Sequence, residues 1–191
     1  PDGQWMLVVE QPAMPSIADV SRAWDGLAGV RIDPVLVSQR QVSFARGLAL
    51  RAVAGGAERK LELPKDARIE RWSWSPDSAR VAWTLATEAG LELWVAEAAG
   101  GAPRKLGQKL NGVLDAPFRW SENGRALVVR LVPEGARAPE ARAVPSGPAV
   151  QETSGSSTPL RTYQDLLADA ESEGRFEHFA RVQLAYMDPS A

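Results

Sequence analysis

The sequence predicts a mainly β protein, a partial β-propeller of about three blades of four short antiparallel strands, with a helical insertion near the C-terminus. Two internal repeats carry this prediction. The stretch "WSPDSARVAW" at 74–83 returns as "WSENGRALVV" at 120–129, and "GGAERKL" at 55–61 returns as "GGAPRKL" at 100–106. A spacing of about 45 residues is typical of propeller blades, each of which is built from four strands.

The clearest unit lies between residues 72 and 106. "RWSWS" alternates Trp and Ser as a strand does, and the Pro-Asp-Ser corner that follows predicts a turn. Two further strands are expected at 79–87 and 91–98, and a Gly-rich corner then leads to a short fourth strand. In the first of these strands Val81, Trp83 and Leu85 are expected on one face, and in the second Leu91, Leu93 and Val95 are expected to share a face.

The other units repeat this order of turns and strands. "PDGQWMLVV" at the start has the same Pro-Asp corner, and "LALRAV" (48–53) stands where "LELWVA" (91–96) stands in the next unit. We therefore assign residues 1–131 to blades, interrupted by an irregular, Pro-containing insertion at about 11–44. Residues 132–150 are rich in Pro and Ala and predict an exposed insertion.

Residues 151–191 predict a helical insertion that returns to a blade strand. Thr158 is the expected N-cap, with Pro159 at the first helical position. Gly174 is expected to divide this helix from a second helical turn that carries Phe176 and Phe179. The expected apolar face of the helix, and then the alternating residues of the closing strand, are Tyr163, Leu166, Leu167 and Ala170, followed by Val182, Leu184 and Tyr186.

Composition and charge exclude several classes of function. The 191 residues are 45% hydrophobic and 24% charged, with a net charge of −2, as in soluble globular proteins. No clustered basic face indicates a nucleic-acid partner, and no apolar run or positive charge indicates a membrane. The absence of cysteine excludes disulfides, thiolate nucleophiles and Cys-based zinc sites. We expect no metal and no cofactor.

The beginning and the length of the chain indicate a part of something larger. "PDGQWMLVVE" has no basic n-region and no cleavage site, so we expect no signal peptide. We expect instead that the given sequence begins inside a structural element. Propellers close with four to eight blades, so about three blades do not make a ring. The chain is expected to belong to a larger propeller or to associate with another copy of itself.

The chemistry of a hydrolase does not appear in these residues. No G-x-S-x-G occurs, and the sole histidine, His178, lies between two phenylalanines where we expect the edge of a helical apolar face. The paired glycines at 55–56 and 100–101 lack the P-loop pattern and are interpreted as turns. The tryptophans are interpreted as blade packing rather than as a ligand platform.

The repeat "WSPDSARVAWTLATEAGLELWVAEAAGGAPRKL" resembles the propeller unit shared by TolB-type proteins and the N-terminal domains of the prolyl oligopeptidase family. Residues 15–34 and 147–188 are similar to segments of the glutamyl endopeptidase-like branch of that family. The resemblance implies a serine peptidase whose α/β-hydrolase domain lies outside this chain. Its propeller would limit access to the active site, so that peptides enter and folded proteins do not. The resemblance also implies cleavage after glutamate and favours a periplasmic or secreted protein.

Two arginines are candidates for binding substrate if the resemblance holds. Arg161 and Arg181 flank the helical insertion, and a guanidinium matches the two oxygens of a carboxylate. An arginine on the propeller could favour peptides with acidic side chains. Most surface arginines, however, are simply solvated and bind no ligand. The alternative function is a stand-alone TolB-type binding or scaffolding module without enzymatic activity. The partners expected are therefore the missing hydrolase domain and blades, or a second copy, together with a peptide substrate.

Overall fold

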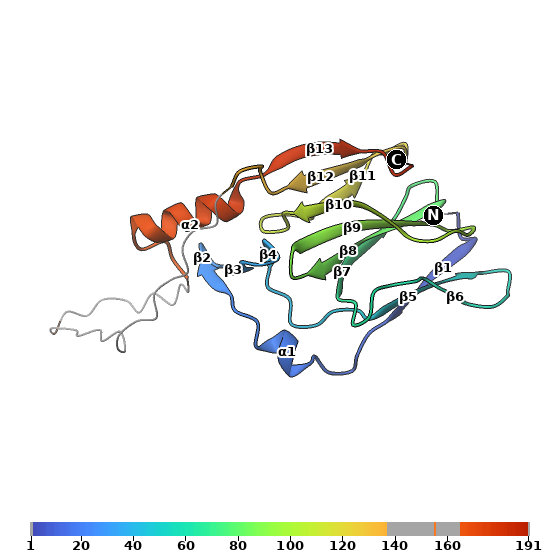
Figure 1. Ribbon diagram of the computed structural model, residues 1–191, viewed down its shortest axis with the longest axis horizontal. Helices are drawn as coiled ribbons and strands as arrows, with labels where there is room; N and C mark the ends of the chain where they lie inside the picture. The colour runs from blue at the N-terminus through green and yellow to red at the C-terminus, as the bar shows by residue number, and fades with distance from the viewer. Residues whose placement is uncertain (1, 137–154, 156–164, 191) are drawn as a thin grey trace.

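The computed structural model describes residues 2–136, 155 and 165–190, and it is mainly β (Figure 1). In chain order the elements are β1 (Trp5–Glu10), α1 (Ile17–Val20), β2 (Asp25–Leu27), β3 (Val30–Asp33), β4 (Ser38–Gln39), β5 (Gly47–Ala52), β6 (Arg59–Lys60), β7 (Ile69–Trp74), β8 (Arg80–Thr87), β9 (Gly90–Glu97), β10 (Arg104–Leu110), β11 (Phe118–Trp120), β12 (Leu127–Leu131), α2 (Ala170–Ala180) and β13 (Gln183–Met187). The predicted predominance of strands is confirmed.

The four strands β7 to β10 form an antiparallel meander at the centre of the molecule. Their first turn is the Pro-Asp-Ser corner, where the Ser75 hydroxyl accepts a hydrogen bond from the Arg80 amide at 2.9 Å and donates one to Asp77 at 2.5 Å. Ser78 takes a positive φ of 61° in that turn. The "WSPDSARVAW" stretch is therefore a hairpin, with Trp74 opposite Val81.

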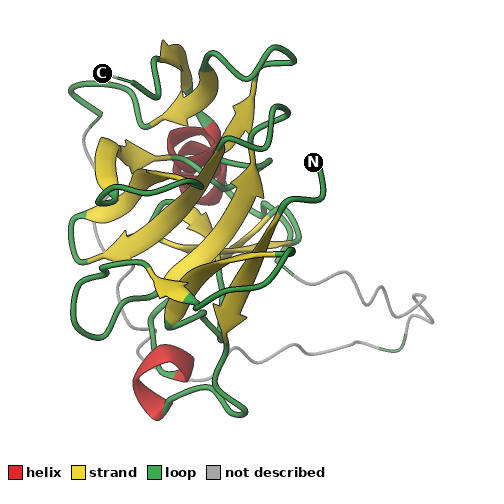
Figure 2. Cartoon of the chain, turned by 90° about the vertical axis from the view of Figure 1, so that its right-hand side faces the viewer, coloured by secondary structure: helices red, strands yellow, loops and turns green. Residues whose placement is uncertain are grey.

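Two further groups of strands repeat parts of this meander. The sheet β1-β5-β6 contains counterparts of β8, β9 and β10, and the strands β11, β12 and β13 are counterparts of β7, β8 and β9. The third group joins the central meander through one pair, Leu110 opposite Leu131, and the resulting sheet is curled like half of a barrel (Figure 2). The arrangement of these groups as blades around a central axis stays a prediction.

The central strands separate two apolar clusters. Val81, Trp83 and Leu85 of β8 share one cluster with residues of β5 and β7, as the alternation predicted. Leu91 and Val95 of β9 belong to the other, which continues to β12. Trp83 is fully buried and stacks on Trp94, with ring centroids 6.5 Å apart. Because both of its faces are covered, β8 is buried at every position from Val81 to Ala86, and Thr84 is the only polar residue among these six.

The predicted Gly-Gly turns are confirmed. Gly55 and Gly56 lie between β5 and β6, with φ of 110° and 122°. Gly100 and Gly101 lie between β9 and β10, with φ of 154° and 97°. These are values that residues with a Cβ rarely adopt.

The insertion between β1 and β5 is not irregular throughout. It contains the one-turn helix α1 and a small antiparallel sheet in the order β2-β3-β4. The hairpin turns at Ala28 and Gly29, both with positive φ (51° and 75°). Strands of two to four residues are too short to establish an alternating pattern, which is why the sequence did not reveal them.

The C-terminal helix begins later than the sequence predicts. Asp169 is the N-cap of α2, and Asp169 and Ser172 form a reciprocal capping box that fixes the start. Leu166 and Leu167 precede the helix, so they are not part of its apolar face. The predicted cap Thr158, with Pro159 and Tyr163, lies outside the described residues.

Two other predictions for this region have different outcomes. Gly174 does not divide the helix but lies inside α2. The closing strand is confirmed as β13, which pairs with β12 from Leu127–Met187 to Leu131–Gln183. Its outward residues Leu184 and Tyr186 are exposed, while Ala185 and Met187 pack on the core.

Segments from the two insertions pack together at one end of the sheet (Figure 1). Phe179 of α2 lies in a small apolar cluster with Leu27 and Ile32 of the β2-β3-β4 sheet, and Arg175 pairs with Asp25. Asn111, which follows β10, donates to the carbonyl oxygens of Phe179 (2.7 Å) and Arg181 (3.2 Å). We call residues 11–46 and 165–182 together the insertion layer.

Candidate functional site

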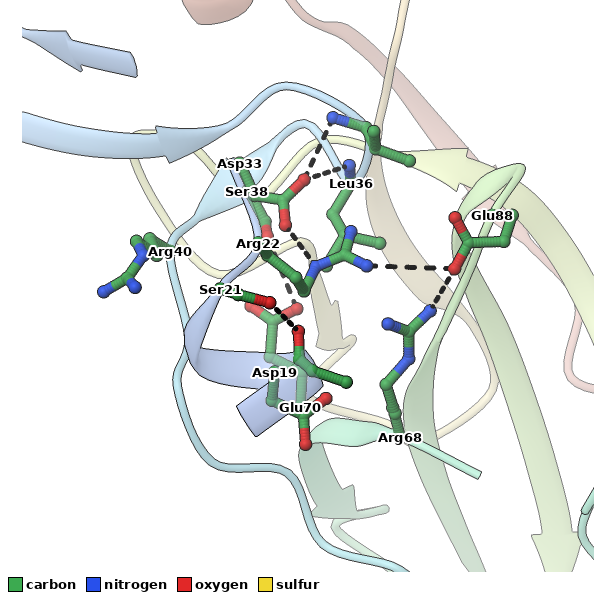
Figure 3. Close-up of polar contacts among 12 residues, drawn as sticks. Asp19, Ser21, Arg22, Asp33, Leu36, Ser38, Arg40, Arg68, Glu70 and Glu88 are labelled. Carbon is green, nitrogen blue, oxygen red and sulfur yellow. Dashed lines mark hydrogen bonds and ion pairs between the residues drawn. The ribbon is translucent and has the colours of Figure 1, made fainter. Parts of the chain in front are cut away.

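Charged side chains gather where the first part of the insertion layer meets β7 and the turn between β8 and β9. The layer contributes two carboxylates and two arginines, and Arg68 and Glu88 come from next to β7 and from the turn between β8 and β9. Figure 3 labels all of these residues except Arg46. We call this group the ionic cluster; its members are Asp19, Arg22, Asp33, Arg46, Arg68 and Glu88. Two of its carboxylates, Asp19 and Asp33, are buried, and buried charges are rare unless they are paired, so the arrangement marks a candidate site.

Asp19 anchors the part of the ionic cluster that lies in α1. Ser16, the N-cap, accepts a hydrogen bond from the Asp19 amide at 3.1 Å, and its hydroxyl donates to the Asp19 carboxylate at 2.7 Å. The guanidinium of Arg46 pairs with the same carboxylate, which is only 3% exposed. The local cap therefore holds a buried negative charge against a cation.

Asp33 holds the second buried carboxylate of the ionic cluster. It accepts hydrogen bonds from the amides of Val35 and Leu36, both at 3.0 Å, and from Nε of Arg22 at 2.7 Å. The hydrogen bond to Asp33 is the main reason that the pKa of Arg22 is raised. These contacts fix the Arg22 guanidinium in one position at the edge of the layer.

Glu88 completes the ionic cluster from the turn between β8 and β9. Its Oε1 lies 2.8 Å from Nη2 of Arg68 and 3.8 Å from Nη1 of Arg22. The two arginine side chains are 17% and 12% exposed, whereas the Glu88 side chain is 82% exposed. One solvated carboxylate thus faces two arginines that are mostly covered.

The ionic cluster borders an open hollow in the surface. Its lining residues are Ser16, Ala18, Asp19, Arg46, Asp66 and Arg68. Arg46 and Arg68 bring guanidinium groups to this hollow, and both take part in ion pairs. Such paired donors are suited to carboxylate or phosphate oxygens.

A second hollow lies beside the ionic cluster, next to Glu70 of β7. It is polar and is lined by Gln39, Gln41, Glu70, Arg71, Gly112, Leu114, Asp115, Ala116 and Pro117. Burial raises the pKa of Glu70 to about 7, although the Ser38 hydroxyl, 3.4 Å from its Oε2, and Arg71 lower it. A carboxyl group that titrates near neutrality can exchange a proton at physiological pH.

Of the two arginines predicted from sequence, the structure describes only Arg181, which lies outside this cluster. Arg181 is the C-cap of α2, is 64% exposed at its side chain, and pairs with Glu177. Arg161 lies outside the described residues. His178 lies in α2 as expected, in edge contact with Phe179, and partial burial is the main reason that its pKa is lowered.

Sequence reasoning missed the residues of the ionic cluster. One local signal was present, because Ser16 followed three residues later by Asp19 is the pattern of a helix N-cap. Arg68 and Glu88 carry no such signal. They are brought near Arg22 only by the folding of the insertion over the sheet.

Comparison with known proteins finds two similar plant proteins. The chain is 30% identical, over 96% of its length, to a probable chloroplastic glutamyl endopeptidase of Oryza sativa subsp. japonica. It is 28% identical, over 94% of its length, to the protein of the same description from Arabidopsis thaliana. The chain spans about a fifth of the length of these curated relatives. No protein-family profile matches it. The chain is thus related to proteins described as peptidases.

Two features are absent from the described residues. None of the helices there has the length and apolar character needed to cross a membrane. The same part of the chain holds no group of three or more His, Cys, Asp or Glu side chains placed to bind a metal ion.

Proposed function

We propose that this chain forms part of the β-propeller of a serine-type peptidase of the prolyl oligopeptidase family, in its glutamyl endopeptidase-like branch. The α/β-hydrolase domain would lie outside these 191 residues. The observation that carries the proposal is similarity over nearly the whole chain to two proteins described as probable glutamyl endopeptidases. The role proposed for the chain is to limit access to the catalytic domain and to select peptides.

The order of strands supports a propeller rather than another β architecture. Two groups repeat parts of the central antiparallel meander, and both insertions fall between strands that correspond to its second and third, at 11–46 and 132–182. The Trp120 indole of β11 donates to the carbonyl of Ser73 of β7 at 3.2 Å, so the first strands of two groups contact each other at this point. Neighbouring blades would bring their first strands together in this way.

The sequence motifs indicate which domain would carry out hydrolysis. The chain contains no G-x-S-x-G and a single histidine that lies in a helix, so it supplies neither the nucleophile nor the base of a triad. Hydrolysis would belong to the catalytic domain, and the propeller would decide what reaches it.

The test is to express the gene to its stop codon and assay peptides that differ only in Glu or Gln at one position. We expect cleavage after Glu, its loss when the G-x-S-x-G serine is replaced by Ala, and little cleavage of folded proteins with the same sites. Residues 1–191 alone are the matched control and should not hydrolyse either peptide. A gene product without a hydrolase domain would contradict the proposal and favour the TolB-type binding module.

Substrate selection by Arg161 and Arg181 is a further part of this proposal. Arg181 is exposed, and Glu177, its partner, is exposed as well, so an incoming carboxylate could compete for it. In the full-length protein, Arg161→Ala and Arg181→Ala should each lower kcat/KM for the Glu peptide more than for the Gln peptide. Unchanged selectivity in both variants would remove these residues from the proposal.

A further inference from the structure

We infer that Arg68 and Arg22 form a carboxylate-binding site that Glu88 of the same chain occupies as an internal stand-in. The ligand is a carboxylate, either the acidic side chain of a peptide or a free carboxylate ion. This site goes beyond the proposed peptidase role, because binding at Arg68 and Arg22 requires neither a catalytic domain nor a closed propeller.

The first argument is the contrast in exposure between the partners. Arg68 and Arg22 have side chains that are 17% and 12% exposed, and both approach one oxygen of Glu88, whose side chain is 82% exposed (Figure 3). A pair with so exposed a carboxylate is weakly held, because water competes for it and a long side chain must be immobilised. Another carboxylate can therefore replace that of Glu88 with little loss of free energy.

The second argument is that the two arginines are held ready. Nε of Arg22 donates to the buried Asp33 at 2.7 Å, which leaves the outer edge of its guanidinium directed towards Glu88. The guanidinium of Arg68 lies 5.9 Å from the centre of the Phe44 ring. Among the described residues, its hydrogen bonds run only from Nη2 to Glu88. Groups fixed before binding lose little freedom when the ligand arrives.

The third argument is the balance of charge. The ionic cluster has three arginines and three carboxylates, and two of the carboxylates, Asp19 and Asp33, are buried with partners of their own. When Glu88 swings away, one positive charge is left without a counterpart at Arg68 and Arg22. The neighbouring hollow offers access to Arg68, and Asp66 on its exposed lining is the one further carboxylate there. The site can therefore accept one carboxylate group in place of that of Glu88.

The test is a titration of the chain followed by NMR of the arginine Nε–Hε groups. The probes are glutarate and two blocked tripeptides, acetyl-Ala-Glu-Ala-amide and its Gln counterpart. We expect glutarate and the Glu peptide to shift the Arg68 and Arg22 signals and the Gln peptide to leave them unchanged. Tighter binding of the peptide than of glutarate would assign the site to peptides, and the reverse order would assign it to free carboxylates.

Variants separate this site from general charge effects. Glu88→Ala should raise the affinity for the carboxylate probes about three- to fivefold, because the internal competitor is removed. The matched control is Glu177→Ala, which removes the exposed partner of Arg181 and should leave the affinity unchanged. Arg68→Gln should abolish the shifts, with circular dichroism to check that the fold is kept.

The inference is overturned if Glu88→Ala does not raise the affinity, or if the Gln peptide shifts the arginine signals as much as the Glu peptide. Glu88 lies at an exposed turn, so this variant keeps the test valid even if Arg68→Gln fails to fold. No hydrolysis is measured here. Failure of this site and failure of the peptidase proposal are therefore separate results.

Discussion

At the scale of single residues, two neighbouring carboxyl groups are buried with different partners. Asp33 accepts hydrogen bonds from two backbone amides and a guanidinium, which together compensate for the burial of its negative charge. Glu70 has only a hydroxyl at 3.4 Å and the field of Arg71, so burial dominates and raises its pKa to about 7. The stability of the protein should therefore depend on the protonation of Glu70.

We expect Glu70 to make the chain less stable as pH rises. Because its pKa is higher in the folded than in the unfolded state, the folded state binds more protons between about pH 4.5 and 7, and the free energy of unfolding falls across that range. Glu70→Gln removes this dependence, so the variant should gain about 1–3 kcal/mol relative to the parent between pH 5 and pH 8. Urea unfolding at both pH values measures it. Glu122→Gln, in an exposed turn, is the control, and an equal gain there would contradict the assignment.

The ion pair between Asp25 and Arg175 should matter for stability. The arginine side chain is 8% exposed and the aspartate 17%, so Asp25→Ala leaves a buried cation without this partner. We expect a loss of about 2–3 kcal/mol in the free energy of unfolding, measured with urea. Asp115→Ala breaks the exposed pair with Arg119 and should lower the free energy of unfolding much less than Asp25→Ala does. Equal losses in the two variants would show that burial of the pair is not the cause.

At the scale of elements, Gly174 offers a test of helix α2. It lies in the helix interior, and a Cβ added there would meet nothing within 4 Å. Gly174→Ala should therefore stabilise the protein by about 0.5–1 kcal/mol, seen as a higher Tm. Gly90→Ala is the counterpart. Gly90 has a φ of 115° in the turn between β8 and β9, so this substitution should lower the Tm. A lower Tm for Gly174→Ala would mean that α2 is not continuous in solution.

The elements that could be predicted from sequence are those with a long enough pattern. The alternation in β8 and β9 and the corners at 55–56 and 100–101 are local signals, and the structure confirms them. The helical placement of Leu166 and Leu167 was wrong because α2 begins only at the capping box of Asp169, while the predicted cap at Thr158 stays untested. The short strands β2 to β4 depend on tertiary packing and had no local signal.

The candidate site was hidden for a related reason. Its charges come from segments far apart in the chain, so no spacing in the sequence relates Arg22 to Glu88. The arginines that could be singled out, Arg161 and Arg181, were identified by their position next to a helical insertion. Arg181 instead makes a pair with Glu177 within α2, an interaction that local spacing explains.

At the scale of the whole molecule, the insertion layer should behave as one cooperative unit. Phe179 is 2% exposed and packs against Leu27 and Ile32 from the other insertion. Phe179→Leu should cost about 1 kcal/mol. Amide hydrogen exchange should then accelerate in residues 25–40 and 170–182 together, while β8 and β9 stay protected. Acceleration confined to α2 would show that the two parts of the layer open independently.

The positions of the two insertions bear on how the chain folds while it is being made. Strands β7 to β10 follow one another through short turns and can pair as they leave the ribosome. Strand β1 must wait for residues 11–46 before β5 arrives, and β12 must wait for residues 132–182 before β13 arrives. During synthesis the sheet β1-β5-β6 would emerge before the central meander and β11 to β13 after it, and β1 and β12 would each expose an unpaired edge until its partner strand emerged.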